Sequence, residues 1–261
     1  MNWFEALILG LLQGFTEFLP VSSSGHLEIA QVLFNTNVDD NLIFAVYVHG
    51  ATVLSTIVVF FNEIVKLFRE GFKFKYNEHT SYILKIFVSM LPVLVIGLLF
   101  KDFITDLFSG NLLLVGGGLI LTSLLLALTK YIKTERKSTI SYTDAFIIGI
   151  AQAFAVIPGL SRSGSTIATG ILLGNKKEEV TKFSFLMVLI PVLGANFIDL
   201  MSGDISRGTD LQFSVILTGF IAAFLAGLVA CKWMITLVKK GNLIYFSIYC
   251  LLLGITAIIF A

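Results

Sequence analysis

Two stretches of this chain, 139 residues apart, are copies of each other. A shift of 139 positions places "NWFEALILGLLQGF", near the N-terminus, on "SYTDAFIIGIAQAF" in the middle of the chain. The same shift places Gln13 on Gln152, and the "SSSG" of residues 22–25 on the "SRSG" of residues 161–164. Chance could match alanines and isoleucines in an apolar chain, but not polar positions at one constant offset. The sequence therefore predicts two structural repeats, residues 1–133 and 140–261, joined in a single domain.

Long apolar runs fix the environment of these repeats. Hydrophobic residues make up 56% of the chain and charged residues 13%, about half the charge of a soluble protein. A run of about 20 apolar residues is long enough to cross a bilayer as a helix. Six runs meet this condition: 42–62, 81–100, 111–132, 180–201, 211–232 and 243–260. We predict an all-α polytopic membrane protein that forms one integral domain. Cys231 and Cys250 lie inside these runs, where we expect them to be packing residues.

The two repeated segments differ from the spans. Residues 3–34 and 142–173 each contain an apolar arm, a polar break with proline and glycine, and a second arm too short to cross. Short apolar arms are typical of re-entrant segments, and irregular backbone at membrane depth must be covered by protein or line a watery cavity. We predict that both are re-entrant helical hairpins.

Each hairpin is followed by three spans, so the second repeat must enter the membrane from the opposite side. Of the 18 lysines and arginines, 15 then fall on one side, Lys101 and Arg207 fall on the other, and Arg162 lies in the second hairpin. Basic loops favour the cytoplasm. The sequence predicts an inverted-topology repeat, with both termini outside the cytoplasm and the two hairpin tips meeting near the midplane.

The hairpins carry the ionisable residues that most need explaining, because such residues are costly inside a membrane. Glu17 and His26 lie in the first hairpin, and Arg162 lies in "PGLSRSGST" of the second. A glycine-rich turn that leads into a helix favours an anion, and the planar guanidinium of arginine matches phosphate oxygens. A carboxylate, an imidazole and hydroxyl groups beside a phosphate site indicate a hydrolytic centre.

Each of these residues could also have a purely structural role. Glu17 and His26 could be a buried pair that fixes the arms of the hairpin, and Arg162 a structural ion pair. We expect Glu28 to be an interfacial carboxylate. For His49 we expect a helix-packing residue rather than a ligand, with a position near the site as the open alternative. The sequence has no Cys/His cluster with transition-metal spacing, although a carboxylate with phosphate oxygens could hold Mg²⁺ or Ca²⁺.

These motifs resemble those of the undecaprenyl-diphosphate phosphatases, also called bacitracin-resistance proteins. The first motif of that family is Glu or Gln, three residues, then Glu, and here it runs from Gln13 to Glu17; the second, PGxSRSGxT, begins at Pro158. The resemblance covers essentially the whole chain. It implies hydrolysis of the diphosphate of a polyprenyl lipid carrier outside the cytoplasm, which recycles the carrier for envelope polysaccharide synthesis, with a divalent cation, Mg²⁺ or Ca²⁺. Many members have Glu where this chain has Gln13. A glutamine can orient a water but cannot act as a base, so a mechanism with two ionised carboxylates does not carry over to this chain. The resemblance also implies that the membrane is a prokaryotic plasma membrane.

The resemblance and the residues together give the expected site. The expected catalytic residues are Glu17, Ser23, His26 and Arg162, with Glu17 also a candidate metal ligand. The expected diphosphate-binding residues are Gln13, Ser22, Ser24, Ser161, Arg162, Ser163, Gly164 and Thr166.

The expected mechanism leaves one alternative open. Arg162 would neutralise the transferring phosphoryl group, Glu17 would orient or deprotonate the nucleophile, and His26 would act as the acid. The nucleophile is either Ser23 or water. Expected partners are the polyprenyl diphosphate, whose tail lies along the spans, membrane lipids and a second copy of the chain, without nucleic acid. The rival function is a secondary transporter or lipid-carrier flippase, because inverted repeats with broken helices are typical of transporters.

Overall fold

The regular elements of the structure, a computed structural model, are all helical, which confirms the predicted class. The structure describes residues 1–34, 38–71, 73, 76–100, 104, 107, 111–131, 137–194, 212–241 and 243–261, with backbone only for 38–42. Statements about helices and contacts refer to these residues. The C-terminal end of the predicted span 180–201 lies outside them.

Each predicted hairpin is a pair of helices separated by a short break. The first consists of α1 (Trp3–Phe18) and α2 (Ser23–Phe34), and the second of α8 (Tyr142–Phe154) and α9 (Arg162–Leu172). The repeat extends to the way the first helix of each pair begins. Asn2 and Glu5 form a capping box on α1, and Ser141 and Asp144 form one on α8. Such a box satisfies two backbone N–H groups at a helix start, so these copied polar residues fix where both hairpins begin.

Among the described helices, three are long and apolar enough to cross a membrane: α5 (Glu78–Leu99), α7 (Leu112–Leu128) with its 3₁₀ extension η1 (Thr129–Tyr131), and α12 (Phe213–Lys239). A fourth crossing is formed if α3 (Val38–Val59) and α4 (Phe61–Gly71), which meet at a 72° bend, make one broken span. The apolar helix α13 (Leu243–Ile259) is shorter, and α10 (Lys177–Met187) follows α9. The structure thus supports a multi-pass membrane protein.

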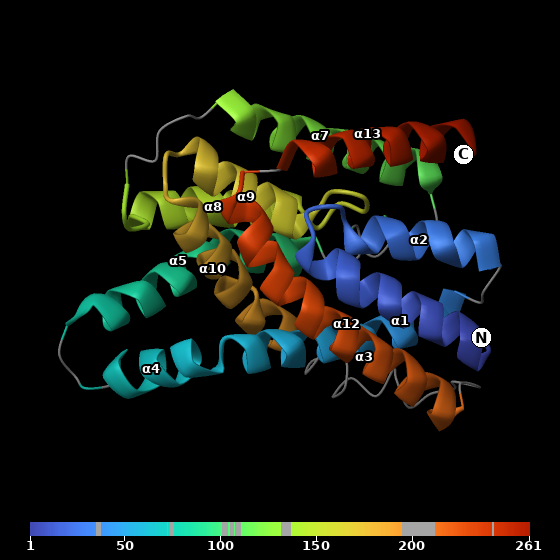
Figure 1. The fold of residues 1–261 in the computed structure, drawn as a ribbon, viewed down its shortest axis with the longest axis horizontal. Helices are drawn as coiled ribbons and strands as arrows, with labels where there is room; N and C mark the ends of the chain where they lie inside the picture. Colours follow the sequence, from blue (N-terminus) through green and yellow to red (C-terminus); the bar gives the residue numbers. More distant parts are fainter. Residues whose placement is uncertain are drawn as a thin grey trace.

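The first helix of each hairpin packs against a helix of the other half of the chain. Helix α1 lies along α12, and α8 lies along α5 (Figure 1). Glycines allow both contacts, because a Cβ at Gly10 would collide with the carbonyl of Gly219, and a Cβ at Gly149 with the carbonyl of Ser89. Gly10 and Gly149 occupy equivalent positions in the sequence repeat. In both halves, therefore, the first helix of the hairpin packs closely against a helix of the other half, and a glycine at the equivalent position allows the contact.

The breaks of the two hairpins meet in the middle of the molecule. The Ser163 hydroxyl donates to the Leu19 carbonyl at 3.1 Å, which joins the second hairpin to the first. A Cβ at Gly25 would lie 3.1 Å from the Cα of Gly159, whose φ is +83°. Glycine is favoured at such a φ. This meeting point holds the residues that the sequence marks as functional.

The remaining helices cover the hairpins. Helices α7 and α13 pack together on one side, where the Ser247 hydroxyl donates to the Ser123 carbonyl at 2.8 Å. Cys231 and Cys250 are buried and free, as expected of packing residues. Large apolar side chains on the outer faces are exposed, including Phe87, Leu98 and Tyr245. Such a surface is suited to lipid.

Candidate active site

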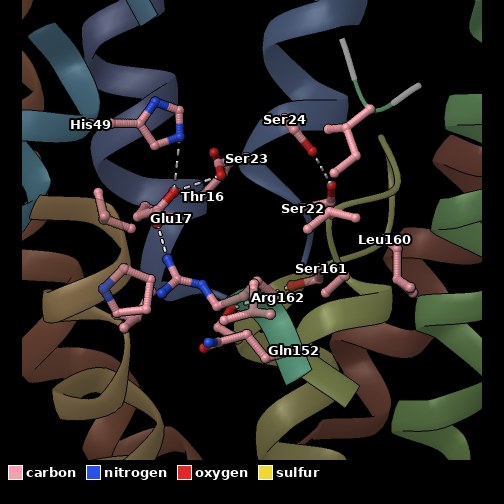
Figure 2. Close-up of a pocket in the computed structure, with 18 residues that line it drawn as sticks. Thr16, Glu17, Ser22, Ser23, Ser24, His49, Gln152, Leu160, Ser161 and Arg162 are labelled. Carbon is pink, nitrogen blue, oxygen red and sulfur yellow. Dashed lines mark hydrogen bonds and ion pairs between the residues drawn. The ribbon is translucent and has the colours of Figure 1, made fainter. Parts of the chain in front are cut away.

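A cavity of about 410 Å³ opens where the two hairpin breaks meet (Figure 2). Both hairpins contribute polar side chains to its wall, while α5 and the segment after α10 contribute apolar ones. The polar lining residues are Thr16, Glu17, Ser22, Ser23, Ser24, His49, Gln152, Ser161, Arg162 and Ser163. The cavity therefore combines a polar centre with an apolar side.

Glu17 is the acidic residue in the lining, and its two oxygens bind different partners. Oε1 accepts from the Arg162 guanidinium. Oε2 accepts from the Ser23 hydroxyl at 2.6 Å and from the Gln13 amide at 2.9 Å. The Glu17 side chain is 9% exposed, so these contacts take the place of water. The carboxylate lies between a cation and a hydroxyl, which is the arrangement of a base that activates a serine.

Arg162 reaches the cavity from the first turn of α9. Ser161 caps this helix by accepting from the Gly164 N–H at 3.0 Å, and its own N–H donates to the Thr122 hydroxyl at 2.9 Å. Two of the backbone N–H groups that we expected to bind an anion are therefore used within the protein. The Arg162 guanidinium and the neighbouring serine hydroxyls remain as the candidate groups for an anion.

Ser22 and Ser24 line the cavity on the side away from Glu17 (Figure 2). Their hydroxyls lie 3.2 Å apart, and Ser22 also accepts from the Gly25 N–H. Ser22 has a positive φ of 70°, which is uncommon for a residue other than glycine. The backbone bends sharply here, so Ser22, Ser23 and Ser24 all face the cavity.

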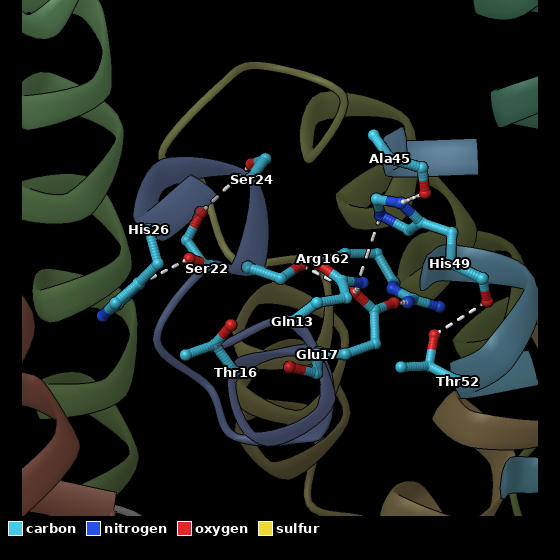
Figure 3. Close-up of polar contacts among 12 residues, drawn as sticks. Gln13, Thr16, Glu17, Ser22, Ser24, His26, Ala45, His49, Thr52 and Arg162 are labelled. Atoms are coloured by element: carbon cyan, nitrogen blue, oxygen red, sulfur yellow. Dashed lines mark hydrogen bonds and ion pairs between the residues drawn. The ribbon is translucent and has the colours of Figure 1, made fainter. Parts of the chain in front are cut away.

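His26 and Thr166 lie outside the cavity lining. The His26 ring bonds the Ser22 carbonyl and the Tyr249 hydroxyl, each at 2.7 Å, and it points away from Glu17 (Figure 3). Thr166 donates to the Arg162 carbonyl at 2.9 Å and shares a hydrogen bond with Ser184. In this geometry both residues support the site from behind.

The structure brings to the site two residues that are not among the expected site residues. The His49 Nε2 lies 3.8 Å from Glu17 Oε2, while its Nδ1 bonds the Ala45 carbonyl at 2.8 Å; of the two alternatives for His49, the structure shows the position near the site. Gln152 lines the cavity beside Arg162 (Figure 2). Its repeat partner Gln13 was a signal that could have found it. Glu28, expected at the membrane surface, is buried.

The described residues contain no cluster of three or more Asp, Glu, His or Cys that would hold a metal by themselves. Mg²⁺ in phosphoryl-transfer sites is commonly held by one or two carboxylates together with substrate phosphates and water. Glu17 fits this arrangement, because it is a single carboxylate that lines a cavity with room for phosphate groups and water.

Together the fold and the cavity define a class, a helical membrane protein with a polar cavity between two helical hairpins. Residues 6–256 match the family described as Bacitracin resistance protein BacA. The chain belongs to this family. It is 53% identical, over 99% of its length and 98% of the relative, to the undecaprenyl-diphosphatase of Parabacteroides distasonis. It is 40% identical to the one of Methanococcus vannielii, over 98% and 99%, and 35% identical to undecaprenyl-diphosphatase 3 of Bacillus anthracis, over 97% and 96%.

Proposed function

We propose that this protein is an undecaprenyl-diphosphatase, which hydrolyses undecaprenyl diphosphate to undecaprenyl phosphate and inorganic phosphate. The membership of the family supports this activity, and so do the relatives of that name. The observation that carries the proposal is the Glu17 carboxylate, which accepts from the Ser23 hydroxyl through one oxygen and from Arg162 through the other. A nucleophile, a base and a phosphate-binding cation thus meet in one cavity.

The contact between Ser23 and Glu17 favours a serine nucleophile. Ser23 Oγ attacks the terminal phosphorus while its proton passes to Glu17 Oε2. The bond from that phosphorus to the bridging oxygen breaks, and undecaprenyl phosphate leaves with the electron pair. Glu17 then gives this proton to the departing undecaprenyl phosphate and is free to act as a base again. Water attacks the phosphorus of the phosphoserine while one of its protons passes to Glu17. The bond from phosphorus to Ser23 Oγ breaks, Ser23 Oγ takes that proton from Glu17, and inorganic phosphate leaves. In the alternative, water bound to Glu17 attacks directly and Ser23 only orients the phosphate.

Arg162 changes partner in this mechanism. Without substrate its charge is balanced by Glu17. A diphosphate brings more negative charge into the cavity, so the guanidinium can bind the phosphoryl oxygens and leave Glu17 to accept a proton. Phosphoryl transfer depends mainly on positioning and on electrostatic stabilisation of this group. Ser22, Ser24, Ser161 and Ser163 supply hydroxyl contacts around it.

A divalent cation, Mg²⁺ or Ca²⁺, belongs to this proposal as a cofactor. Glu17 and the oxygens of the diphosphate would hold it, with water as the remaining ligands. When bound, it would neutralise phosphate charge and help to orient the diphosphate. Both ring nitrogens of His26 have partners within the protein, the Ser22 carbonyl and the Tyr249 hydroxyl. We therefore propose that His26 holds the bend of the first hairpin and does not act directly as the acid.

The membrane arrangement that we propose has six spans and two re-entrant hairpins related by inversion. The two hairpins, each with a capping box at its start, support this arrangement. The packing of α1 on α12 and of α8 on α5, each across the two halves, also supports it. The cavity would open to the extracytoplasmic side. The prenyl tail would leave through the apolar wall, which includes Val93, Val188 and Val192.

Phosphate release by the purified protein in detergent tests this function. We expect wild type to release phosphate from undecaprenyl diphosphate, and Arg162→Ala to be slower by about 1,000-fold or more, the effect of removing a catalytic arginine in phosphoryl transfer. Near wild-type release by Arg162→Ala would overturn the site. Binding without release, together with lipid movement in vesicles, would favour the transporter or flippase instead.

A further inference from the structure

The described side chains include one buried amide in the cavity that has no partner. Gln152 is 3% exposed and lines the cavity. Neither its Nε2 nor its Oε1 has a hydrogen-bond partner among the described residues. A carboxamide has two donors and an acceptor oxygen, and buried polar groups are normally satisfied by protein, water or a ligand. This side chain therefore calls for a group that occupies the cavity.

The repeat explains why Gln152 lacks a protein partner. Its counterpart Gln13 donates its amide to Glu17. At the position of the second hairpin that corresponds to Glu17, the chain has Val156. The second hairpin thus keeps the glutamine of the motif but replaces the acid that would engage it. Arg162 stands at the position of Ser23 in the same comparison, so the second hairpin has a cationic donor where the first has the proposed nucleophile.

The position of Gln152 matches a phosphate. Its carboxamide lies beside the Arg162 side chain, on the far side of that side chain from Glu17 (Figure 2). The ion pair holds the guanidinium against the carboxylate of Glu17. A phosphoryl group that draws Arg162 away from Glu17 would meet both donors together.

We propose that Gln152 is a further catalytic residue, whose Nε2 donates to a non-bridging oxygen of the terminal phosphate while its Oε1 accepts from a cavity water. This inference rests on the proposed diphosphatase activity. It adds a neutral donor to the charged one of Arg162. A neutral donor can strengthen its bond in the transition state without opposing release of the phosphate product.

Two near-isosteric variants test this role, because the catalytic and the structural interpretations predict opposite orders of their activities. Gln152→Met removes the donor and the acceptor, and should lower kcat/KM about 100-fold, as the loss of one transition-state donor does. Gln152→Glu keeps an acceptor but places a carboxylate against the phosphate, so it should be slower still and should raise the inhibition constant for inorganic phosphate. A structural role, in which Gln152 only holds a water, predicts the opposite order, because Glu can hold water and Met cannot.

Controls separate this inference from the proposed function and from folding. Ser165→Ala also removes a buried hydroxyl without a partner among the described residues, but Ser165 is not in the cavity lining, and we expect its activity to be unchanged. Thermal unfolding in detergent should show Gln152→Met at least as stable as wild type. Wild type without phosphate release would overturn the function itself. An active wild type with Gln152→Met equally active, or with Glu faster than Met, would overturn only the role of Gln152.

Discussion

The two carboxylate oxygens of Glu17 accept hydrogen bonds from three side chains. One oxygen is committed to Arg162 and the other to Ser23 and Gln13, with His49 nearby. Such a carboxylate is well held by cationic and neutral donors while no ligand is present. In the proposed mechanism a diphosphate competes with Glu17 for Arg162, so Glu17 would set both the affinity for phosphate and its own availability as a base.

Glu17→Gln separates these two effects. The amide cannot accept the Ser23 proton, and we expect turnover to fall by about 100-fold or more, the contribution of a positioned base. Because Gln leaves Arg162 without its ion partner, inorganic phosphate should bind more tightly than to wild type. Phosphate-release kinetics and phosphate inhibition measure the two quantities. Weaker phosphate binding in this variant would contradict the competition for Arg162.

Ser23→Ala decides between serine and water as the nucleophile. If Ser23 attacks phosphorus, the variant should lose at least about 1,000-fold in turnover, as enzymes do without their nucleophile. Wild type quenched in acid during turnover of substrate labelled in the terminal phosphate should then carry label on Ser23. Ser24→Ala is the matched comparison, since Ser24 bonds Ser22 rather than Glu17, and it should lose less than Ser23→Ala. Substantial turnover by Ser23→Ala, with no labelled protein in wild type, would leave water as the nucleophile.

The sequence could predict Glu17, Ser23 and Arg162 because their residue types are costly in a membrane or cluster at the hairpin breaks. It could not predict which way His26 faces. That direction is set by the Tyr249 hydroxyl, 223 residues away along the chain. His49 reached the site for a similar reason, since the packing of α3 brings it within 3.8 Å of Glu17. Residue type and local spacing carry no information on these tertiary distances.

Among the helices, the hairpins were the most predictable elements. Their polar starts repeat as capping boxes, and such local chemistry is visible in sequence. The bend between α3 and α4 was not predicted, because residues 42–62 read as one continuous apolar run. Which helix each hairpin packs against was also beyond the sequence, since Gly10 and Gly149 identify a close approach without naming the partner.

The close approach of α8 to α5 can be tested with one methyl group. Gly149→Ala places a Cβ against the carbonyl of Ser89, so we expect a loss of about 1–3 kcal/mol in stability, typical of overpacking. Gly117 on α7 has nothing within 4 Å of a Cβ built there. Gly117→Ala should therefore be neutral or stabilising by up to about 1 kcal/mol through helix propensity. Unfolding of both variants in detergent makes the comparison, and equal stability would contradict the packing of α8 on α5.

At the scale of the whole molecule, both termini lie toward one end, and the end of α4 and the start of α5 lie toward the other (Figure 1). The basic residues of α4 and its surroundings, such as Lys66 and Arg69, belong to that second end. Positive charge favours the cytoplasmic side. We therefore propose that the termini lie outside and that the end of α4 and the start of α5 lie inside.

Labelling of single cysteines in intact cells tests this orientation. Cys231 and Cys250 are buried, so native thiols should react little with a membrane-impermeant maleimide. Ala261→Cys, at the exposed C-terminus, should be labelled without permeabilisation. Arg69→Cys, whose native side chain is 80% exposed, should be labelled only after the membrane is opened. The reverse pattern would place the basic side outside, and the proposed extracytoplasmic opening of the cavity would then be wrong even if the hydrolysis of undecaprenyl diphosphate were intact.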